Sequence, residues 1–279
     1  MRTQLATLAA RAHPAVVESQ IDFLVPGLER PFAYGREAFG PEAETARFAT
    51  HTVQIEDIRG GDGLTLEQHG ATLGWWPTRV RRFYDEQHVM RRYYPECADI
   101  IRTALGADRV IVFDHNVRRG GSPQSLAQPG SVGRPVHHAH TDYTPRSARR
   151  RLREELGANA EQEVSRFVQV NLWRPIRGPL REAPLAICAG DSLSEDQLCT
   201  VELRYRDRNG EIYYLLHAPG QRWHFASDMT VDEAWLIKNF DSAPRGAGHL
   251  APHSAFTDPQ ALPGPPRESI EVRALALFY

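Results

Sequence analysis

A short histidine-rich segment, RPVHHAHTDYTPR, carries the residues best suited to bind a metal ion. Within it, His140 and Asp142 are separated by one residue. In a β-strand, residues i and i+2 point to the same face, so this imidazole and this carboxylate could reach one cation together. A surface turn with a histidine beside an aspartate would give the same pattern. A distant second histidine would complete a two-histidine, one-carboxylate set, which leaves coordination positions open for Fe(II) oxygen chemistry.

The C-terminal part of the chain supplies the remaining groups in a suitable order. His253 lies in the segment PHSAFTDP, and Arg267 follows 14 residues later in the motif R-x-S, at the start of a strong strand pattern. A guanidinium pairs bidentately with a carboxylate, and the Ser269 hydroxyl adds one more donor. The order therefore predicts an Fe(II) site completed by His253. Arg267 and Ser269 would bind the distal carboxylate of 2-oxoglutarate, with O2 as the oxidant.

Five blocks of this sequence resemble one family of oxygenases. That family includes the cephamycin 7α-methoxylation component and the fungal AsaB-type hydroxylase/desaturases, among them a gibberellin desaturase. The resemblance implies a non-haem iron, 2-oxoglutarate-type oxidoreductase that acts on a natural product or another small metabolite. The last block is the most specific. The blocks are VFDHNVR (112–118), VHHAHTDYT (136–144), VNLWRPIRGPLREAPLAIC (170–188), RWHFASDMTVDEAWLIKNFDS (222–242) and PHSAFTDP…PRESIEVRALALF (252–278).

Two other histidines compete with His253 for the distal ligand position. His217 lies 77 residues after His140, and His224 lies in an aromatic strand pattern where it could equally be a core residue. Members of the family often carry a histidine where this chain has Gln221, so this stretch is less suited to supply a ligand here. His253 alone lies just before the R-x-S strand, and we therefore prefer it.

Other polar residues could contact the co-substrate or the substrate. Asn171 and Arg174 in the segment NLWRP could line the pocket, although this stretch could equally pack in a core. Arg273 follows Arg267 by six residues, an even spacing that puts both side chains on one face of a regular strand. Arg273 is thus the alternative clamp for the co-substrate carboxylate.

Four residues near the predicted ligands have less specific roles. Arg118 and Asp114 could form a buried ion pair in the wall of the pocket. His137 and His138 adjoin the His-x-Asp pair, and we expect them at the rim of the site or in contact with the ligands. None of these four is expected to bind the metal.

The elements that must position these residues are mainly strands. After residue 165 the chain shows eight short strand patterns separated by Gly, Pro and Asp turns, an arrangement typical of a sandwich or jelly roll. Before them, residues 80–105 have helical spacing of apolar residues. Residues 120–135 are rich in Gly, Ser and Pro, which predicts a mobile loop and a lid. A charged helix is expected over 145–163.

These patterns predict an α+β fold that is mainly β. We expect a double-stranded β-helix of the jelly-roll or cupin-like kind, with an N-terminal helical part. The chain would form a single domain over 1–279, in which a mixed helical extension (1–110) packs on the β-helix core (110–279). Residues 230–237, TVDEAWLI, could begin as a helical turn capped by Thr230 and Glu233.

Composition excludes several other classes of function. The 279 residues carry a formal net charge of −2, which gives no electrostatic reason to bind nucleic acid or an anionic membrane. Three scattered cysteines predict reduced thiols rather than a disulfide framework. The N-terminus lacks the apolar stretch of a signal peptide, and no stretch approaches the ~18 apolar residues that span a bilayer. A cytoplasmic protein with a small-molecule substrate is expected.

The predicted activity is oxidation of a small organic molecule by an Fe(II)/2-oxoglutarate dioxygenase. Through a ferryl species it would hydroxylate, desaturate or cyclise its substrate while 2-oxoglutarate becomes succinate and CO2. Two alternatives stay open at this point. The first is a cupin-like metal dioxygenase or isomerase that needs no 2-oxoglutarate. The second is a β-sandwich binding module without catalysis.

Overall fold

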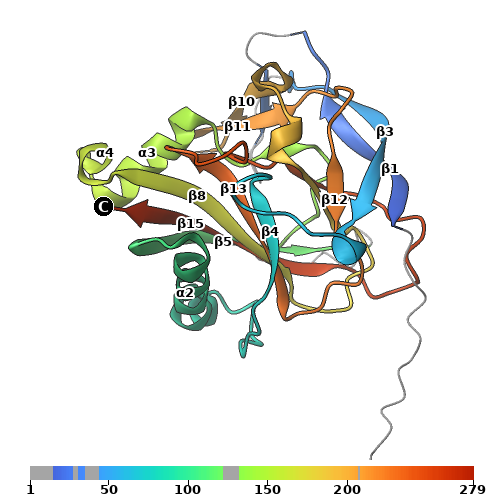
Figure 1. Cartoon of the computed structure of the whole chain (residues 1–279), viewed down its shortest axis with the longest axis horizontal. Helices are drawn as coiled ribbons and strands as arrows, with labels where there is room; N and C mark the ends of the chain where they lie inside the picture. The colour runs from blue at the N-terminus through green and yellow to red at the C-terminus, as the bar shows by residue number, and fades with distance from the viewer. Residues whose placement is uncertain (1–14, 28–30, 35–43, 122–131, 207) are drawn as a thin grey trace, which may run out of the picture.

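The structure is a computed structural model that describes residues 15–27, 31–34, 44–121, 132–206 and 208–279. Strands predominate in these residues, and the longest helices lie at one side and one end of the strands (Figure 1). The strands are β1 (Val16–Leu24), β2 (Phe32–Tyr34), β3 (Phe48–Asp57), β4 (Ala71–Trp75), β5 (Arg109–Arg119), β6 (Val132–Gly133), β7 (His140–Thr141), β8 (Arg166–Pro175), β9 (Leu185–Cys188), β10 (Leu198–Arg204), β11 (Asn209–Leu215), β12 (Trp223–Phe225), β13 (Glu233–Asp241), β14 (His253–Ala255) and β15 (Glu268–Phe278). The helices are α1 (Glu86–His88), α2 (Tyr94–Leu105), α3 (Pro145–Leu156) and α4 (Ala160–Glu163), with a π-helical turn (Val89–Tyr93) that joins α1 to α2.

The strands form two sheets. The smaller sheet has the order β4-β13-β8-β15-β5-β6, and its long central strands pair antiparallel. The larger sheet has the order β1-β3-β12-β9-β14-β7-β11-β10-β2. Apolar side chains from both sheets, among them Trp173, Ile187 and Trp235, pack into a shared core. The fold is therefore mainly β, with two sheets that enclose a common interior.

The larger sheet curls until its first strand returns to its middle. Asp22 in β1 forms a parallel bridge with His138, and the backbone N–H of Ala139 donates to the Asp22 carbonyl at 2.9 Å. A second bridge joins Leu24 to Leu216. The contacts of Asp22 hold the segment that leads into β7, and the Leu24–Leu216 bridge holds the chain just after β11.

The helices cover the outer face and one end of the smaller sheet (Figure 1). Helix α2 presents Cys97 and Ile101 to apolar residues of β5, β8 and β15 on the face that points away from the larger sheet. Helix α3 begins at a capping box in which Thr144 and Ser147 satisfy each other's backbone N–H groups. The N-cap Thr144 therefore lies two residues after Asp142, and α3 itself begins at Pro145.

The strand patterns after residue 165 are confirmed, since all eight form strands, β8 to β15. In the N-terminal part, the helical spacing over 80–105 is confirmed by α1, the π-helical turn and α2, whereas the longest elements before them are strands. Its first strands, β1 and β3, pair with each other and join the larger sheet through β12. The reason is visible in β1, where Val17, Ser19, Ile21 and Phe23 are buried and alternate with more exposed residues. This period of two is the pattern of a strand with one buried face.

Two smaller expectations also need correction. The charged helix expected over 145–163 is divided, because Gly157 with a φ of 99° ends α3 and α4 begins three residues later. The Thr230 N–H donates to the Glu233 carboxylate at 2.8 Å, as a helix cap would, but the chain continues directly into β13. The pair closes a turn before a strand. Most of the predicted lid loop, 122–131, lies outside the described residues.

No helix in the described part of the chain is long and apolar enough to cross a membrane. The three cysteines form no disulfide, as predicted, and Cys97 and Cys188 are buried among apolar side chains.

A buried charge cluster holds the end of β13. Arg166 Nε donates to Asp241 Oδ1 at 2.8 Å, and Lys238 Nζ contacts Asp241 Oδ2 at 2.9 Å. Burial opposes ionisation of Asp241, but Arg166 and Lys238 outweigh it and lower its pKa. The pairing register of β13 shifts between Lys238 and Phe240, at a bulge that contains Asn239. This cluster thus anchors the segment that carries Asn239 into the interior.

Replacing Asp241 by Ala should destabilise the fold by about 3–5 kcal/mol, because two buried cations lose their partner. Urea unfolding near neutral pH measures this change. Glu202→Ala, which removes a largely exposed pair with Arg204, should cost no more than about 1 kcal/mol. Because the pKa of Asp241 is lowered in the folded state, its contribution is complete above the unfolded pKa of about 3.9. The difference from wild type should therefore narrow as the pH falls below that value, and a gap that widens in acid would contradict the assignment.

Candidate metal centre

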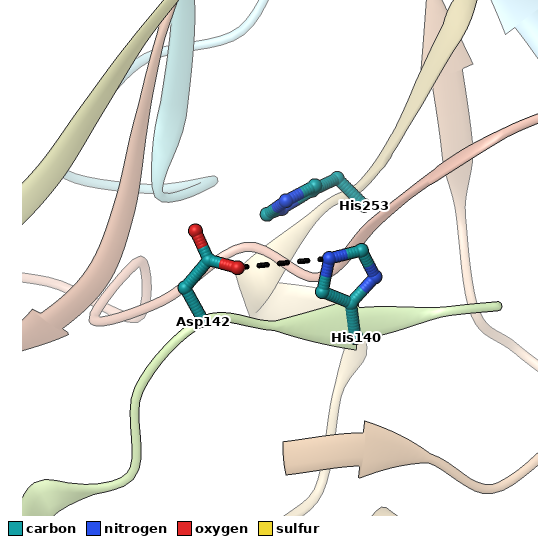
Figure 2. Close-up of side chains that lie close together, drawn as sticks. All are labelled: His140, Asp142 and His253. Atoms are coloured by element: carbon teal, nitrogen blue, oxygen red, sulfur yellow. Dashed lines mark ion pairs between the residues drawn. The ribbon is translucent and has the colours of Figure 1, made fainter. Parts of the chain in front are cut away.

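Three side chains from distant parts of the chain converge in the interior between the sheets. His140 begins β7, Asp142 directly follows that strand, and His253 begins β14. Strands β7 and β14 pair antiparallel with His253 opposite His140, so the two imidazoles lie on the same face. One nitrogen or oxygen from each of the three residues lies within 4.8 Å of the others. Figure 2 shows both rings and the carboxylate directed toward a common point.

The hydrogen bonds of the two histidines leave one nitrogen of each ring available. His140 Nδ1 lies 2.7 Å from the His138 carbonyl, and His253 Nδ1 lies 3.3 Å from the Ala251 carbonyl. A carbonyl only accepts, so Nδ1 donates in both rings and Nε2 keeps its lone pair. His253 Nε2 is buried without a hydrogen-bond partner, and His140 Nε2 is 3.7 Å from Asp142 Oδ1, too long for a hydrogen bond. Two acceptor nitrogens without a hydrogen-bond donor fit the ligand set of a divalent cation.

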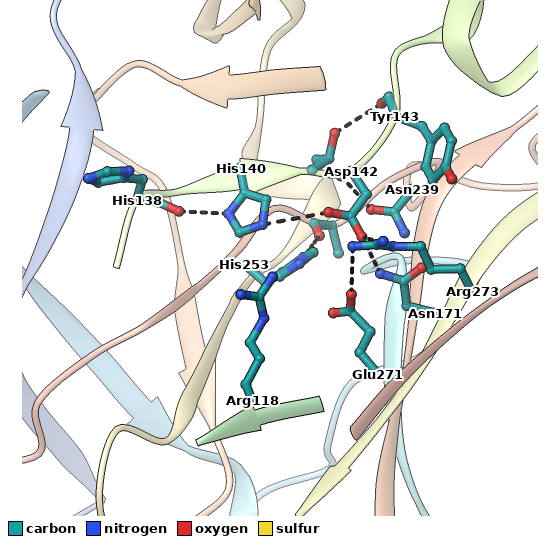
Figure 3. Close-up of polar contacts among 12 residues, drawn as sticks. Arg118, His138, His140, Asp142, Tyr143, Asn171, Asn239, His253, Glu271 and Arg273 are labelled. Atoms are coloured by element: carbon teal, nitrogen blue, oxygen red, sulfur yellow. Dashed lines mark hydrogen bonds and ion pairs between the residues drawn. The ribbon is translucent and has the colours of Figure 1, made fainter. Parts of the chain in front are cut away.

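Three neighbours hold Asp142, two through its carboxylate and one through its backbone (Figure 3). Asn171 Nδ2 donates to Oδ2 at 2.7 Å, and Arg273 Nε donates to the same oxygen at 3.0 Å. The Asp142 backbone N–H donates to Asn239 Oδ1 at 2.9 Å. Because Oδ2 already accepts two hydrogen bonds, Oδ1 is the oxygen left to face the histidines. The arrangement favours a carboxylate that binds a metal through one oxygen.

Electrostatics put these groups in the protonation states that a divalent cation requires. Burial lowers the pKa of His140 to about 4, with a further contribution from His253, so the ring is neutral near pH 7. Burial opposes ionisation of Asp142, but the Arg273 guanidinium outweighs it and holds the pKa well below its usual range. Two neutral imidazoles and one carboxylate are the donor set of non-haem Fe(II) sites. The residues present therefore fit iron.

Arg267 and Ser269 lie on β15 or just before it and are almost fully buried. Arg267 Nε donates to Ser269 Oγ at 3.0 Å and Nη1 to the Ala183 carbonyl at 2.7 Å, while the guanidinium stacks over Trp173. Among the described residues no carboxylate forms an ion pair with it. Burial lowers its pKa to about 9, and nearby Arg118 adds to this effect. A buried cation of this kind favours an anionic ligand.

Arg273, the alternative clamp for the co-substrate carboxylate, binds carboxylates of the protein itself. Besides Asp142, it contacts Asp114 through Nη1 and Glu271 through Nη2, each at 3.0 Å. Its three carboxylate contacts leave it fully engaged as a support for the metal ligand. The expected pair between Arg118 and Asp114 is therefore wrong, because Asp114 pairs with Arg273 instead.

The two residues predicted from NLWRP separate, because they lie on opposite faces of β8. Asn171 reaches the site, where it contacts Asp142 rather than an open pocket. Arg174 points to the outer face, where it donates to the carbonyls of Trp76 and Val231 and lies over the Tyr93 ring. The prediction that Arg174 contacts the co-substrate is therefore wrong. An odd spacing along a strand puts two side chains on opposite faces.

The rival histidines lie elsewhere: His224 is in β12 of the larger sheet, and His217 follows β11. His217 stacks on His51 with ring centroids 4.0 Å apart and contacts Phe23. His224 in β12 is 3.8 Å from Glu56 and belongs to no metal-binding group among the described residues. His253 is the histidine that the structure brings to His140.

Two residues of the site were not predicted. Asn239 was hidden in a strand whose register shifts at a bulge, which no local pattern reveals. Glu271 is buried beside Arg273. The sequence could have predicted its position, because Arg267, Ser269, Glu271 and Arg273 follow one another at intervals of two, and such residues share one face of a strand. Burial raises the pKa of Glu271, and the Asp142 carboxylate adds to this effect.

Comparison with known proteins gives this site its context. A family model described as an oxidoreductase/YMDC permease-like domain matches residues 21–277. The hydroxylase/desaturase efuI of Hormonema carpetanum is 30% identical over 83% of this chain and 85% of its own length. The alpha-ketoglutarate-dependent dioxygenase phiK of a fungal species is 30% identical over 97% of this chain and 99% of its own length.

A solved structure agrees with these relatives. The iron and alpha-ketoglutarate-dependent endoperoxidase NvfI superposes with a TM-score of 0.85 and 26% identity, covering 95% of this chain and 98% of that one. The chain belongs to this family of Fe(II)/2-oxoglutarate-dependent oxygenases and is an oxidoreductase of that class. A co-substrate-independent metalloenzyme and a non-catalytic module, both left open by the sequence, are thereby set aside.

Asn171→Ala should weaken divalent metal binding by roughly tenfold, at the lower end of the effects seen when a partner of a metal ligand is removed. The reason is that Asp142 Oδ2 would keep only the hydrogen bond from Arg273. Titration with Mn(II), followed by electron paramagnetic resonance, measures the change. Asn209→Ala, in the exposed β10–β11 hairpin, is the matched control and should bind Mn(II) like wild type. Equal affinity in the two variants would show that Asn171 does not support the ligand.

Proposed function

We propose that His140, Asp142 and His253 hold the Fe(II) of this oxygenase. The observation that carries this assignment is the convergence of one donor atom from each residue within 4.8 Å, in an interior where His253 Nε2 has no other partner. The two Nε2 atoms and Asp142 Oδ1 would be the ligands. One face of the cation would then remain open for co-substrate and oxidant.

Arg267 and Ser269 would bind the distal carboxylate of 2-oxoglutarate. The support is a buried guanidinium that has only a hydroxyl and a carbonyl as hydrogen-bond acceptors. Trp173 beneath the guanidinium fixes its plane and excludes water from one side. Charge-assisted pairing in such a site is strong, because the anion replaces a missing partner rather than water.

When bound, iron and 2-oxoglutarate supply the oxidation of a substrate C–H bond by O2, with succinate and CO2 as co-products. The chain's own residues keep the centre in order. Arg273 and Asn171 hold Asp142 Oδ2, so that this carboxylate cannot turn away from the metal. The carbonyls of His138 and Ala251 orient the two rings. Because the ligands are buried, water has little access to them.

The substrate class follows from the relatives. Their names describe hydroxylase/desaturases and an endoperoxidase, and one is an aspirochlorine biosynthesis protein. We place this chain among enzymes that hydroxylate, desaturate or cyclise a natural-product-like metabolite. Within the family, its motifs favour the branch of the cephamycin 7α-methoxylation component and the AsaB-type hydroxylase/desaturases.

Three broader expectations belong to the same proposal. The two facing sheets would form a double-stranded β-helix of the jelly-roll kind. The chain over 1–279 would act as one domain, since β1 and β3 complete the larger sheet and β4 the smaller one. We also place the protein in the cytoplasm, in keeping with its reduced cysteines.

Anaerobic addition of Fe(II) and 2-oxoglutarate should produce a weak visible charge-transfer band. His140→Ala should abolish it, because the metal loses one of its three ligands. His217→Ala is the matched control, since it removes a histidine distant from the centre, and it should leave the band unchanged. A His140→Ala protein that retains the band would refute the proposed ligand set.

Two variants distinguish the role of Arg267, just before β15, from that of Arg273, within β15. Arg267→Ala should raise the 2-oxoglutarate concentration for half-saturation of the band by roughly a hundredfold, as expected for loss of a charge-assisted bidentate pair. Its Mn(II) affinity should stay near that of wild type. Arg273→Ala should chiefly weaken Mn(II) binding, because Asp142 loses its ion pair. The reverse pattern would make Arg273 the clamp.

A further inference from the structure

Three buried carboxamides lie together on the inner face of the smaller sheet, beside Asp142. Asn171 on β8 and Asn239 on β13 both contact Asp142, and Figure 3 shows their amides directed toward it. Gln169 lies two residues before Asn171 on β8 and therefore points to the same face. All three side chains are fully buried.

The strand register brings Gln169 next to Asn239. Lys238 of β13 pairs with Val170 of β8, and Phe240 pairs with Gln169. Asn239 is therefore the extra residue of a bulge between these two pairs, and a bulge changes the direction in which a side chain projects. The amides of Gln169, Asn171 and Asn239 are thus neighbours across β8 and β13.

Four polar atoms of these amides have no hydrogen-bond partner among the described residues. They are Nε2 and Oε1 of Gln169, Oδ1 of Asn171 and Nδ2 of Asn239. The side chains opposite Gln169 on the adjacent strands offer no partner, because Leu275 and Phe240 are apolar. Buried amide groups in folded proteins are hydrogen-bonded as a rule, since an unpaired one has lost its hydration without replacement.

The four atoms comprise donors and acceptors in equal number. Nε2 of Gln169 and Nδ2 of Asn239 donate, whereas Oε1 of Gln169 and Oδ1 of Asn171 accept. None of the four is in hydrogen-bond geometry with another, so a bridging molecule must both donate and accept. Water meets this requirement, and an internal water typically makes about three hydrogen bonds to buried polar groups that lack protein partners.

Each asparagine of this group contacts Asp142 with one atom of its amide and has the other atom without a partner. Asn171 donates to the Asp142 carboxylate through Nδ2, and its Oδ1 is the unpaired atom. Asn239 accepts from the Asp142 backbone through Oδ1, and its Nδ2 is the unpaired atom. A hydrogen bond at the unpaired atom fixes the plane of the amide. Both attachments of Asp142 therefore depend on what binds there.

We infer that Gln169 is a positioning residue of the metal centre, which holds the amides of Asn171 and Asn239 through bound internal water. Gln169 contacts no metal ligand itself, and its effect on the metal passes through these two amides to Asp142. The inference rests on the proposed function, because it takes Asp142 as a ligand of the iron.

Gln169→Met tests this role, because methionine has a similar length and volume but no amide. We expect Mn(II) to bind about fivefold more weakly, a smaller loss than the roughly tenfold one at which removal of a direct partner of a ligand begins. Titration of the full chain with Mn(II), followed by electron paramagnetic resonance, measures the change. An affinity equal to that of wild type would overturn the inference.

Val168→Ala is the matched control for a packing defect on the same strand. Val168 is buried on the outer face of β8, among the apolar residues that meet α2. Its truncation should lower the melting temperature by several degrees and leave the Mn(II) affinity unchanged, because no hydrogen bond of Asp142 is involved. If this variant bound Mn(II) as weakly as Gln169→Met, the effect would be one of general destabilisation, and the role assigned to Gln169 would be refuted.

A double-mutant cycle tests the route from Gln169 to the metal ligand. Because Gln169 acts partly through Asn171, Gln169→Met should weaken Mn(II) binding less in an Asn171→Ala protein than in wild type. Part of the effect should remain, since Asn239 is still present. Two losses that simply multiply in the double variant would show that Gln169 does not act through Asn171, and would contradict the inference.

A crystal structure of the Mn(II)-loaded protein tests the bridging water directly. We expect a water within about 3.2 Å of the Gln169 amide and of Asn171 Oδ1 or Asn239 Nδ2, and its loss in Gln169→Met. A wild-type structure without such a water would overturn the inference.

The proposed function is tested separately by the charge-transfer band. A wild-type protein that forms no band with Fe(II) and 2-oxoglutarate would refute that function. A wild-type protein that forms the band, together with a Gln169→Met protein that binds Mn(II) normally, would refute only the role of Gln169.

Discussion

The buried ion pair between Arg273 and Asp142 is the interaction on which the site depends. An isolated carboxylate in this interior would bind a proton, because burial penalises its charged form. Arg273 reverses that preference, and Asn171 saturates the same oxygen. The carboxylate is thereby kept ionised and held in one orientation with its other oxygen toward two neutral imidazoles. Its neighbours thus set the geometry of the metal centre before any metal binds.

The two sheets bring the members of this network together. Strand β15 contributes Arg273 and Glu271, β8 contributes Asn171, and β13 contributes Asn239 through its bulge. The larger sheet contributes the histidines by pairing β7 with β14. Because the charged groups lie where the sheets face each other, ligand geometry and fold stability rely on the same packing. The closure of β1 onto the segment before β7 extends this dependence to the N-terminal strands.

Arg267 and Arg273 have different surroundings, which their spacing in the sequence could not distinguish. Arg273 is surrounded by three carboxylates, whereas Arg267 meets a hydroxyl and a carbonyl. A guanidinium that is already compensated supports a neighbour, and one that is buried without an anion attracts a ligand.

The sequence by itself determined the donor types, their order along the chain and the strand content after residue 165. These are local properties: the His-x-Asp spacing, the R-x-S motif and alternating burial follow from neighbours in the chain. Only the tertiary structure decided that His253, and neither His217 nor His224, meets His140, because strand pairing between distant segments has no local signal. It also placed Arg174 outside the site and Asn239 inside it, since the face a side chain takes depends on register and on a bulge.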